Sequence, residues 1–418
     1  MLENERANRV SSDLFNSTIL PVPPLRRDIQ ILPVEDNGHS LLLFYDPMKI
    51  SASGFALDRS VEPVLSLIDG RKSLDQLIPY FADGVSAKEL LKFIRMLDDQ
   101  KLLESDHFRV HAEWIETTFE DADLRPPALS KTSYPADEDK LEEFMQNIMK
   151  QSNGSVVSST PLKALYAPHI DLRVGSKQYA EAFSTLKNIK PKRVVILATA
   201  HYSGYHPAMY DGYPFIGTAK DYQLPGRMLK TDRDTMHLLD KNGTETGFTL
   251  KDRAHRIEHS IETHLLFASH IWKHDFQIVP ILVAGIDEIF YKTDGDLGQK
   301  IDRFSEQLKE IDTEDTFYLI SGDLSHVGKK FGDVLPAESM RNDVENFDHK
   351  FIKTVSESDL GGLISHMAAE YDSYRVCGFP PLFTFLKAFP GYKGTRINYH
   401  WWNESERESA VSFGSIAF

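Results

Sequence analysis

The sequence predicts an α/β protein. A mostly parallel sheet with helices on both faces, over residues 124–418, follows a small α+β domain over residues 25–115. In the long second region, runs rich in valine and isoleucine alternate with stretches of helical spacing, as is typical of a parallel sheet covered by helices. A break at residues 125–127 (Arg-Pro-Pro), which no helix can cross, separates this region from an earlier one with its own hairpin and helices. A chain of 418 residues is also long enough for two domains.

Composition indicates an ordered globular protein and limits its partners. Hydrophobic residues make up 41% of the chain and aromatic residues 11%, and the net charge of −15 disfavours a broad surface for nucleic-acid phosphates. Cys377 is the only cysteine, so no internal disulfide forms. No apolar run approaches the roughly 20 residues of a membrane span, and the first residues lack the pattern of a signal peptide. We expect a cytoplasmic protein with neither a nucleic-acid nor a membrane partner.

Residues 25–115, after a tail at residues 1–24, have the pattern of a small winged-helix domain. Asn37-Gly38 is a strong hairpin signal between two short strands. Apolar residues at helical spacing, two serines as N-caps and a closing apolar strand complete the pattern. The expected elements are strands at 29–33, 40–46 and 101–104 and helices at 61–68, 74–81 and 88–101.

Residues 68–77, with the preceding Leu-Leu-Phe-Tyr-Asp-Pro of residues 42–47, resemble the small peptide-recognition domain of the PqqD type. The resemblance implies a module that binds a peptide or a partner by adding a strand to a sheet edge. The alternative is a domain that only supports the larger one. DNA binding fits poorly, because the third expected helix carries Glu89, Asp98 and Asp99 and lacks a basic face.

Residues 116–123 are expected to be a linker, because the chain turns acidic there and loses its periodicity ahead of the two prolines. After the linker, Asp137 can cap a helix whose inward apolar face ends at Ile148. The small polar residues at 151–160 predict a loop.

Four apolar runs and four stretches of helical spacing predict the core of the second region. The first run leads to His169, the second to His201, and the last to Asp323 and His326. The carboxyl ends of parallel strands meet at one rim of a sheet, where ligands bind in such folds. Three runs that lead to histidine therefore predict a site at that rim. The expected strands are 162–167, 193–198, 276–283 and 316–320, and the expected helices are 179–186, 235–239, 257–271 and 297–308.

The segment 253–264 adds further candidates. His255 and His259 are four residues apart, as are Glu258 and Glu262, so each pair is expected on one face of the predicted helix. Glu258, His259 and Glu262 are the better candidates for a pocket wall. Arg253, His255 and His264 suit a solvated helix of mixed charge.

Cys377 is the last candidate. A free cysteine is usually a small buried hydrophobe. Here Gly378 and two prolines make a turn that can present the thiol, ahead of a helix expected at 382–389. The start of a helix or a bound cation would favour the thiolate.

Taken together, the motifs of the second region resemble the Memo family over about residues 124–418. Glu-His-Ser-Ile-Glu at 258–262 and Asp-Leu-Ser-His at 323–326 are the specific ones. The others are Tyr-Pro-Ala-Asp at 134–137, Ala-Pro-His at 167–169, His201, Leu-Pro-Gly-Arg at 224–227, Val-Pro-Ile-Leu-Val at 279–283 and Val-Cys-Gly at 376–378. The family is similar in fold to class III extradiol dioxygenases, so the resemblance implies a metal-type pocket at the rim of the sheet.

The resemblance also implies roles for the rim residues. The direct metal ligands would be His169, His201 and Cys377. The residues that line the pocket and serve catalysis would be Asp323, His326 and His259. Two imidazoles and a thiolate suit iron, copper or zinc rather than magnesium or calcium.

The sequence departs from the family pattern in two places. After Ala-Pro-His the family commonly has Ala-Gly-Tyr, whereas this chain has Ile170-Asp171-Leu172, which adds the Asp171 carboxylate to the pocket. A threonine-proline turn of the family is replaced by Gln-Leu-Pro-Gly at residues 223–226. These changes leave the implied ligands intact and concern substrate recognition.

Bacterial relatives resemble the B component of the AmmeMemoRadiSam set, which implies a radical-SAM enzyme and an Amme-type protein as partners in modifying a protein or peptide. The leading hypothesis is a metal-dependent redox enzyme with His326 or His259 as the acid–base group. The alternative is a binding protein that kept the fold without its chemistry. A third hypothesis is a zinc peptidase, because residues 255–259 fit the His-x-x-Glu-His pattern, which needs both histidines on one helical face.

Overall fold

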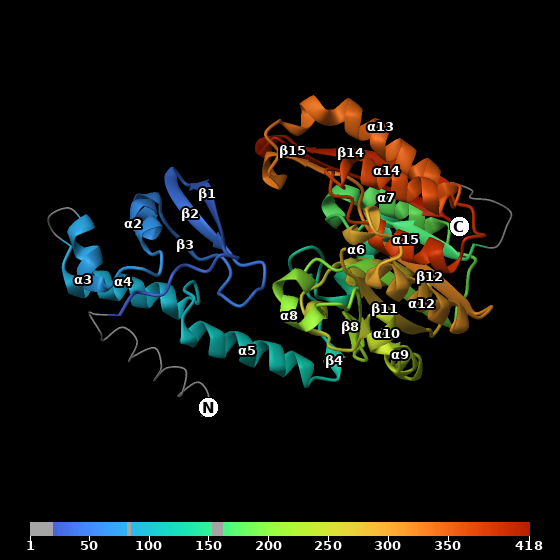
Figure 1. The fold of residues 1–418 in the computed structure, drawn as a ribbon, viewed down its shortest axis with the longest axis horizontal. Helices are drawn as coiled ribbons and strands as arrows, with labels where there is room; N and C mark the ends of the chain where they lie inside the picture. The colour runs from blue at the N-terminus through green and yellow to red at the C-terminus, as the bar shows by residue number, and fades with distance from the viewer. Residues whose placement is uncertain (1–19, 82–84, 153–161) are drawn as a thin grey trace. The chain divides into compact units, whose positions relative to one another are not determined.

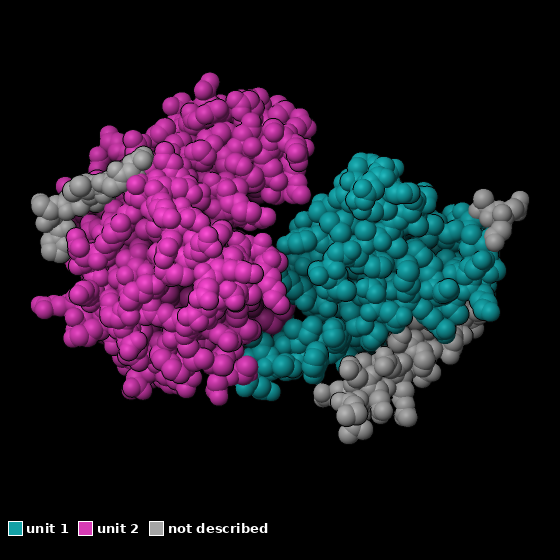
Figure 2. All heavy atoms as spheres, turned by 180° about the vertical axis from the view of Figure 1, so that it is seen from behind, with its two compact units in different colours: residues 1–121 teal, residues 122–418 magenta. Residues whose placement is uncertain are grey.

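The computed structural model describes residues 20–81, 85–152 and 162–418. Most of the tail expected at residues 1–24 and of the loop expected at 151–160 lies outside the described residues. The chain divides into two units, residues 1–121 and residues 122–418 (Figure 2). Each unit is built around its own buried apolar side chains.

The first unit is an antiparallel three-stranded sheet, in the order β1-β2-β3, with helices after it (Figure 1). Asn37 and Gly38 both have positive φ, 50° and 81°, as the expected two-residue hairpin requires. Ser73 and Ser86 each form a capping box at the start of a helix. The elements are β1 (Gln30–Asp36), β2 (His39–Tyr45), β3 (Ala56–Asp58), α2 (Glu62–Leu67), α3 (Leu74–Leu77), α4 (Ala87–Asp99) and α5 (Asp106–Glu120).

Three features of the first unit differ from the expectation. The short strand β3 was not predicted. The strand expected at 101–104 is only an isolated bridge between Leu103 and Leu25. Helix α5 begins after the N-cap Ser105 and covers most of the segment 116–123 that was expected to be a linker. Sequence periodicity missed α5 because it buries few side chains, namely His107, Glu116 and Phe119.

The second unit contains a large mixed sheet with a parallel centre, which confirms the predicted fold class (Figure 1). The strand order is β13-β15-β5-β12-β6-β11-β9-β8-β4, and β5, β12, β6 and β11 pair in parallel. These four parallel strands are the four apolar runs of the sequence. The strands are β4 (Leu124–Arg125), β5 (Ala164–Ala167), β6 (Arg193–Thr199), β7 (Phe215–Gly217), β8 (Asp221–Leu224), β9 (Arg227–Thr231), β10 (Phe248–Thr249), β11 (Gln277–Val283), β12 (Thr316–Ser321), β13 (His326–Gly328), β14 (Thr395–Glu404) and β15 (Ser409–Ala417).

Helices cover both faces of this sheet. The side chains of β6 show this, because they alternate between two apolar clusters, one on each face. Val195 and Leu197 pack with residues of α12 and α15, whereas Val194 and Ile196 pack with residues of α6, α7 and α11. The helices are α6 (Glu138–Met149), α7 (Leu172–Ser184), α8 (Pro207–Tyr210), α9 (Arg233–Asp240), α10 (Gly243–Thr246), α11 (Ser260–Ile271), α12 (Asp296–Glu310), α13 (Ala337–Ser356), α14 (Leu360–Glu370) and α15 (Phe379–Ala388). None of the helices in the described ranges has the length and apolarity needed to cross a bilayer.

Asp348 ties the loop after β12 to the C-terminal strands. This buried carboxylate of α13 accepts hydrogen bonds from Ser325 Oγ at 2.6 Å, Ser412 Oγ at 2.5 Å and Tyr399 Oη at 2.9 Å. Burial raises the pKa of Asp348 to about 6, although the three hydroxyl donors lower it. The buried carboxyl group of Asp348 therefore fixes the loop that carries Asp323, through Ser325.

We predict that Asp348→Asn flattens the pH dependence of stability. The folded-state pKa of about 6 lies above the ordinary value of 3.8, so the stability from this group is complete at low pH and is lost as the pH rises through about 6. Between about pH 4 and pH 7, the free energy of unfolding of the wild-type protein should fall by about 2–3 kcal/mol more than that of the variant. Urea unfolding at both pH values measures this difference. The exposed Asp343 of the same helix provides the control, Asp343→Asn, which should keep the wild-type pH dependence. If the free energy of unfolding of Asp348→Asn changes with pH as much as that of the wild-type protein, the prediction is contradicted.

Candidate metal centre

The site lies where three parallel strands end. Strands β5, β6 and β12 each end two residues before a candidate residue, namely His169, His201 and Asp323. The ends are level, because Ser321 of β12 pairs with Ala167 of β5 on one side and with β6 on the other. This is the rim at which the sequence predicted a site.

His169, His201 and His259 form a cluster of imidazoles at this rim. The ring centroids lie 4.7 Å apart for His169 and His201, 5.2 Å for His169 and His259, and 4.7 Å for His201 and His259. The side chain of His169 is only 2% exposed, whereas those of His201 and His259 keep 29% and 28%. A ligand can therefore approach the cluster from the side of His201 and His259.

The hydrogen bonds of His169 fix where its proton lies. Ser321 Oγ donates its hydrogen to the carbonyl of Ser260 at 2.7 Å, so it can only accept from His169 Nδ1, at 3.2 Å. Nε2 is then unprotonated and faces Cys377 and Asp323. Burial, together with the charges of the neighbouring histidines, holds the pKa of His169 well below 6.5, so the ring is neutral at pH 7. Neutral imidazole with a free Nε2 is the form that binds a metal.

Glu258 orients the other two imidazoles. Its buried carboxylate accepts a hydrogen bond from His201 Nδ1 at 2.9 Å and lies 3.2 Å from His259 Nδ1. It also accepts the backbone N–H groups of His201 and His259. Although burial works in the opposite direction, His201 and His259 hold the pKa of Glu258 well below 4.5. Glu258 was predicted as a pocket residue, and it lies behind the imidazoles, where a carboxylate fixes the ring orientation.

Cys377 and Asp323 lie on the other side of His169. Cys377 Sγ is 3.5 Å from His169 Nε2, and Asp323 Oδ2 is 3.7 Å from the same nitrogen. Asp323 accepts the backbone N–H of His169 through Oδ1 and donates its own N–H to the sulfur at 3.2 Å. Burial raises the pKa of Asp323 to about 7 and raises the pKa of the Cys377 thiol well above 9.

Two glycines let the Cys377 turn approach the loop after β12. A Cβ at Gly322 would lie 2.2 Å from Gly378 Cα, so neither backbone could come as close with a larger residue. Thr199 Oγ1 donates to the carbonyl of Cys377 at 2.7 Å, and helix α15 begins directly after Gly378. That helix starts earlier than the 382–389 expected. Thr199 and Ser321 were not predicted as site residues, and the only available signal was that each is the polar last residue of an apolar strand.

The hydrogen bonds of His326 and Asp171 go to groups other than the imidazole cluster. His326 Nδ1 lies 3.0 Å from the carbonyls of Leu324 and Arg375, so Nδ1 carries the proton and Nε2 is free. Burial lowers the pKa of His326 to about 4. Asp171 caps helix α7 and pairs with Arg173 at 2.6 Å, so these interactions of its carboxylate are with its own helix and not with the imidazoles.

Glu262 lies in a buried network rather than in the cluster. Its carboxylate pairs with the fully buried Arg125 and accepts the hydroxyl of Tyr134 at 2.5 Å. It also accepts the backbone N–H groups of Ala128 and Leu129, at 2.7 and 2.9 Å. Glu262 therefore anchors the start of the second unit to α11, while Arg125 also donates to the backbone carbonyl of Glu258.

The expected helix over 257–271 was wrong at its start. Helix α11 begins at Ser260, with His259 as its N-cap, so His255 and His259 do not share a helical face. Both nitrogens of His255 already have partners, Tyr222 Oη and the carbonyl of Ile216, each at 2.9 Å. The zinc-peptidase hypothesis loses its geometric basis.

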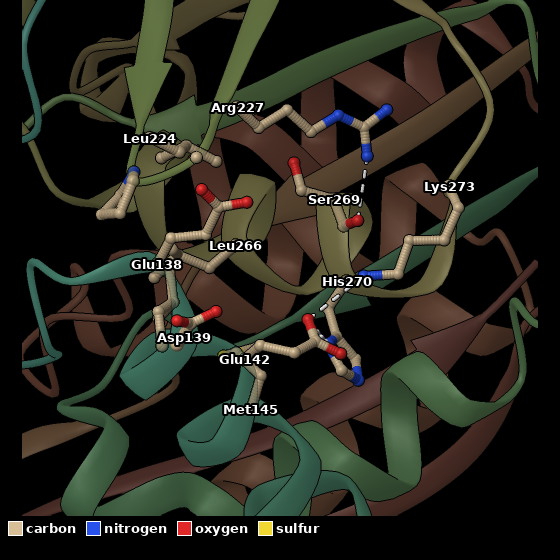
Figure 3. Close-up of a pocket in the computed structure, with 13 residues that line it drawn as sticks. Glu138, Asp139, Glu142, Met145, Leu224, Arg227, Leu266, Ser269, His270 and Lys273 are labelled. Carbon is tan, nitrogen blue, oxygen red and sulfur yellow. Dashed lines mark hydrogen bonds and ion pairs between the residues drawn. The ribbon is translucent and has the colours of Figure 1, made fainter.

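A separate pocket of about 400 Å³ lies between α6, the β8–β9 turn and the end of α11 (Figure 3). Glu142 contacts His270 and Lys273 there, each at 3.2 Å. Arg227, from the Leu-Pro-Gly-Arg motif, donates to backbone carbonyls at the end of α11. None of the candidate site residues lines this pocket, and the motif serves to fix α11.

Among the described residues, two overlapping groups of donors are close enough to hold a metal ion. They are His169 with His201 and His259, and His169 with Asp323 and Cys377, in each of which the ligand atoms lie within 4.8 Å of one another. Imidazole and sulfur together suit iron, copper or zinc, whereas magnesium and calcium prefer oxygen. The donor chemistry therefore fits a transition metal.

Comparisons with known proteins cover both units. The family model of Memo-like proteins matches residues 125–417. A MEMO1 family protein of Aquifex aeolicus is 24% identical over 380 residues, which cover 89% of this chain and 94% of that protein, so the similarity extends beyond the second unit. A MEMO1 family protein of Pyrococcus abyssi is 27% identical over 265 residues, 61% of this chain and 84% of that protein. One of Thermus thermophilus is 24% identical over 336 residues, 79% of this chain and 93% of that protein.

We predict that Glu262→Ala destabilises the protein by about 3–5 kcal/mol, because it leaves the buried guanidinium of Arg125 without its counter-charge. Urea unfolding measures the loss. Glu142→Ala is the matched control: this carboxylate pairs with Lys273 and contacts His270, but its side chain is 44% exposed, so its loss should cost less than about 1 kcal/mol. Similar small losses in both variants would contradict a structural role for Glu262.

Proposed function

Because the chain belongs to the Memo family, we propose that it is a metal-dependent redox enzyme whose centre is held by His169, His201 and Cys377. The observation that carries the proposal is the pairing of His169 Nε2 with Cys377 Sγ, 3.5 Å apart. This nitrogen has a free lone pair because Nδ1 is bonded to Ser321. Iron or copper is the favoured ion, with zinc as the third candidate.

The protein groups would divide the work as follows. A bound iron or copper ion would supply electron transfer and polarisation of a bound substrate. Glu258 holds His201 in the tautomer with a free Nε2, and Ser321 does the same for His169. The half-buried Cys377 would be the third ligand and would shield one side of the centre from water.

Proton transfer is proposed for the residues beside the ligands. Asp323, with a pKa raised by burial to about 7, can hold or release a proton at Oδ2 near neutral pH. His326 is neutral at that pH and can accept a proton at Nε2. His259 faces the open side of the cluster and would meet the substrate first.

The partners proposed for the enzyme are a radical-SAM enzyme and an Amme-type protein, acting together on a protein or peptide. The first unit supports this proposal through β1, a seven-residue strand that lies at the edge of the described three-stranded sheet. An extended peptide can add to such an edge by backbone hydrogen bonds, in the manner of PqqD-type domains.

We predict that protein purified without oxygen retains iron or copper, and that His169→Ala, His201→Ala and Cys377→Ser each weaken retention at least about tenfold, because each removes a ligand. Elemental analysis after dialysis against a chelator measures the loss. His237→Ala removes an exposed histidine of α9 and should retain the wild-type content. Equal retention in the ligand variants and in the control would contradict the ligand set.

The second candidate is a binding protein that holds a peptide without catalysis, which the edge position of β1 also favours.

We predict oxygen uptake when the metal-loaded chain is incubated with a catechol or a thiol, and a fall to background with His201→Ala, because a metal ligand is lost. An oxygen electrode measures the rate. A loaded wild-type protein that consumes no oxygen would favour the second candidate.

A further inference from the structure

Tyr166 is a buried phenol to which the centre described above gives no role. It lies on β5 and is 0% exposed. Within the described ranges its hydroxyl has no hydrogen-bond partner. Tyr179 and Tyr318 are equally buried, but each donates to a backbone carbonyl. A buried hydroxyl without a partner is rare in folded proteins and requires an explanation.

The hydroxyl lies directly beneath the turn that carries Cys377. A Cβ at Gly378 would lie 2.3 Å from Tyr166 Oη, and a Cβ at Gly322 would lie 3.3 Å from the ring. Both glycines therefore leave room for the phenol. Burial, and after it the neighbouring Cys377, raise the pKa of the Tyr166 hydroxyl well above 10.

Each oxygen acceptor near the phenol accepts at least one hydrogen bond from another group. The carbonyl of Asp323 accepts Gly378 N–H at 2.9 Å, and the carbonyl of Cys377 accepts Thr199 Oγ1 at 2.7 Å. Asp348 accepts three other hydroxyls. The sulfur of Cys377 accepts one N–H group, from Asp323 at 3.2 Å, lies 3.7 Å from the carbonyl of Asp323, and makes no hydrogen bond with the phenol. A neutral thiol is a weak acceptor, whereas a metal-bound thiolate is negative and accepts further hydrogen bonds.

We propose that Tyr166 is a positioning residue, whose hydroxyl donates a hydrogen bond to the sulfur of Cys377 when that sulfur ligates a metal ion. The inference rests on the proposed function, in which Cys377 is a ligand. Hydrogen bonds to a ligating sulfur withdraw electron density from it and so tune the metal. The hydroxyl without a partner is then a donor kept in place for the loaded state.

Cobalt(II) added to the metal-free, full-length protein tests the proposal, because a thiolate bound to cobalt gives a near-ultraviolet charge-transfer band. In Tyr166→Phe the band should move to longer wavelength, since the sulfur loses its donor, and the affinity for cobalt should fall about tenfold. The unfolding temperature of the metal-free variant should equal or exceed that of the wild-type protein, because the lost hydroxyl had no partner.

Tyr318→Phe is the matched control. It removes a buried hydroxyl that donates to the carbonyl of Leu308, so its unfolding temperature should fall while the cobalt band stays in place. A wild-type band and affinity in Tyr166→Phe would overturn the proposal. If Cys377→Ser keeps the wild-type cobalt spectrum, the thiol is not a ligand, and both the proposed ligand set and the role of Tyr166 are overturned.

Discussion

The parallel pairing of β5, β12 and β6 is the constraint on which the rest of the site depends. Level strand ends bring His169, His201 and Asp323 to one rim, although the sequence separates them widely. The thiol of Cys377 does not lie on the sheet but on the turn before α15. That turn reaches the rim only because Gly322 and Gly378 lack side chains. The site is thus defined by strand register on one side and by a close backbone approach on the other.

Buried carboxylates hold this arrangement, and each has a full set of partners. Glu258 binds two imidazoles and three backbone N–H groups, Glu262 binds Arg125 and the segment after it, and Asp348 binds three hydroxyls. A buried charge is tolerated only with such compensation. Among the described residues, the hydroxyl of Tyr166 is one of several buried polar atoms without a hydrogen-bond partner, and it lies next to the turn that carries Cys377.

Sequence reasoning located the strands and the rim because continuous runs of valine and isoleucine have a single physical use, burial on both faces of a sheet. It misplaced the start of α11, because His255 and His259, and Glu258 and Glu262, are four residues apart and so imitate a helical face. It missed the short strand β3 and the helix α5, whose few buried side chains leave no periodic signal. It also assigned Glu262 to the pocket, since its partner Arg125 lies far away in the sequence and no local pattern reveals a buried ion pair.

Burial at the centre has opposite consequences for the metal-free and metal-bound forms. Without a cation, burial keeps the His169 ring neutral and the thiol of Cys377 protonated, and it raises the pKa of Asp323 to about 7. The site then holds little uncompensated charge. A cation entering the proposed ligand set would displace the thiol proton, so binding would tighten as the pH rises. The anion left behind would face that cation in a medium of low dielectric, where their attraction is strong. The same desolvation that opposes the thiolate in the empty centre would therefore hold it firmly once the metal is bound.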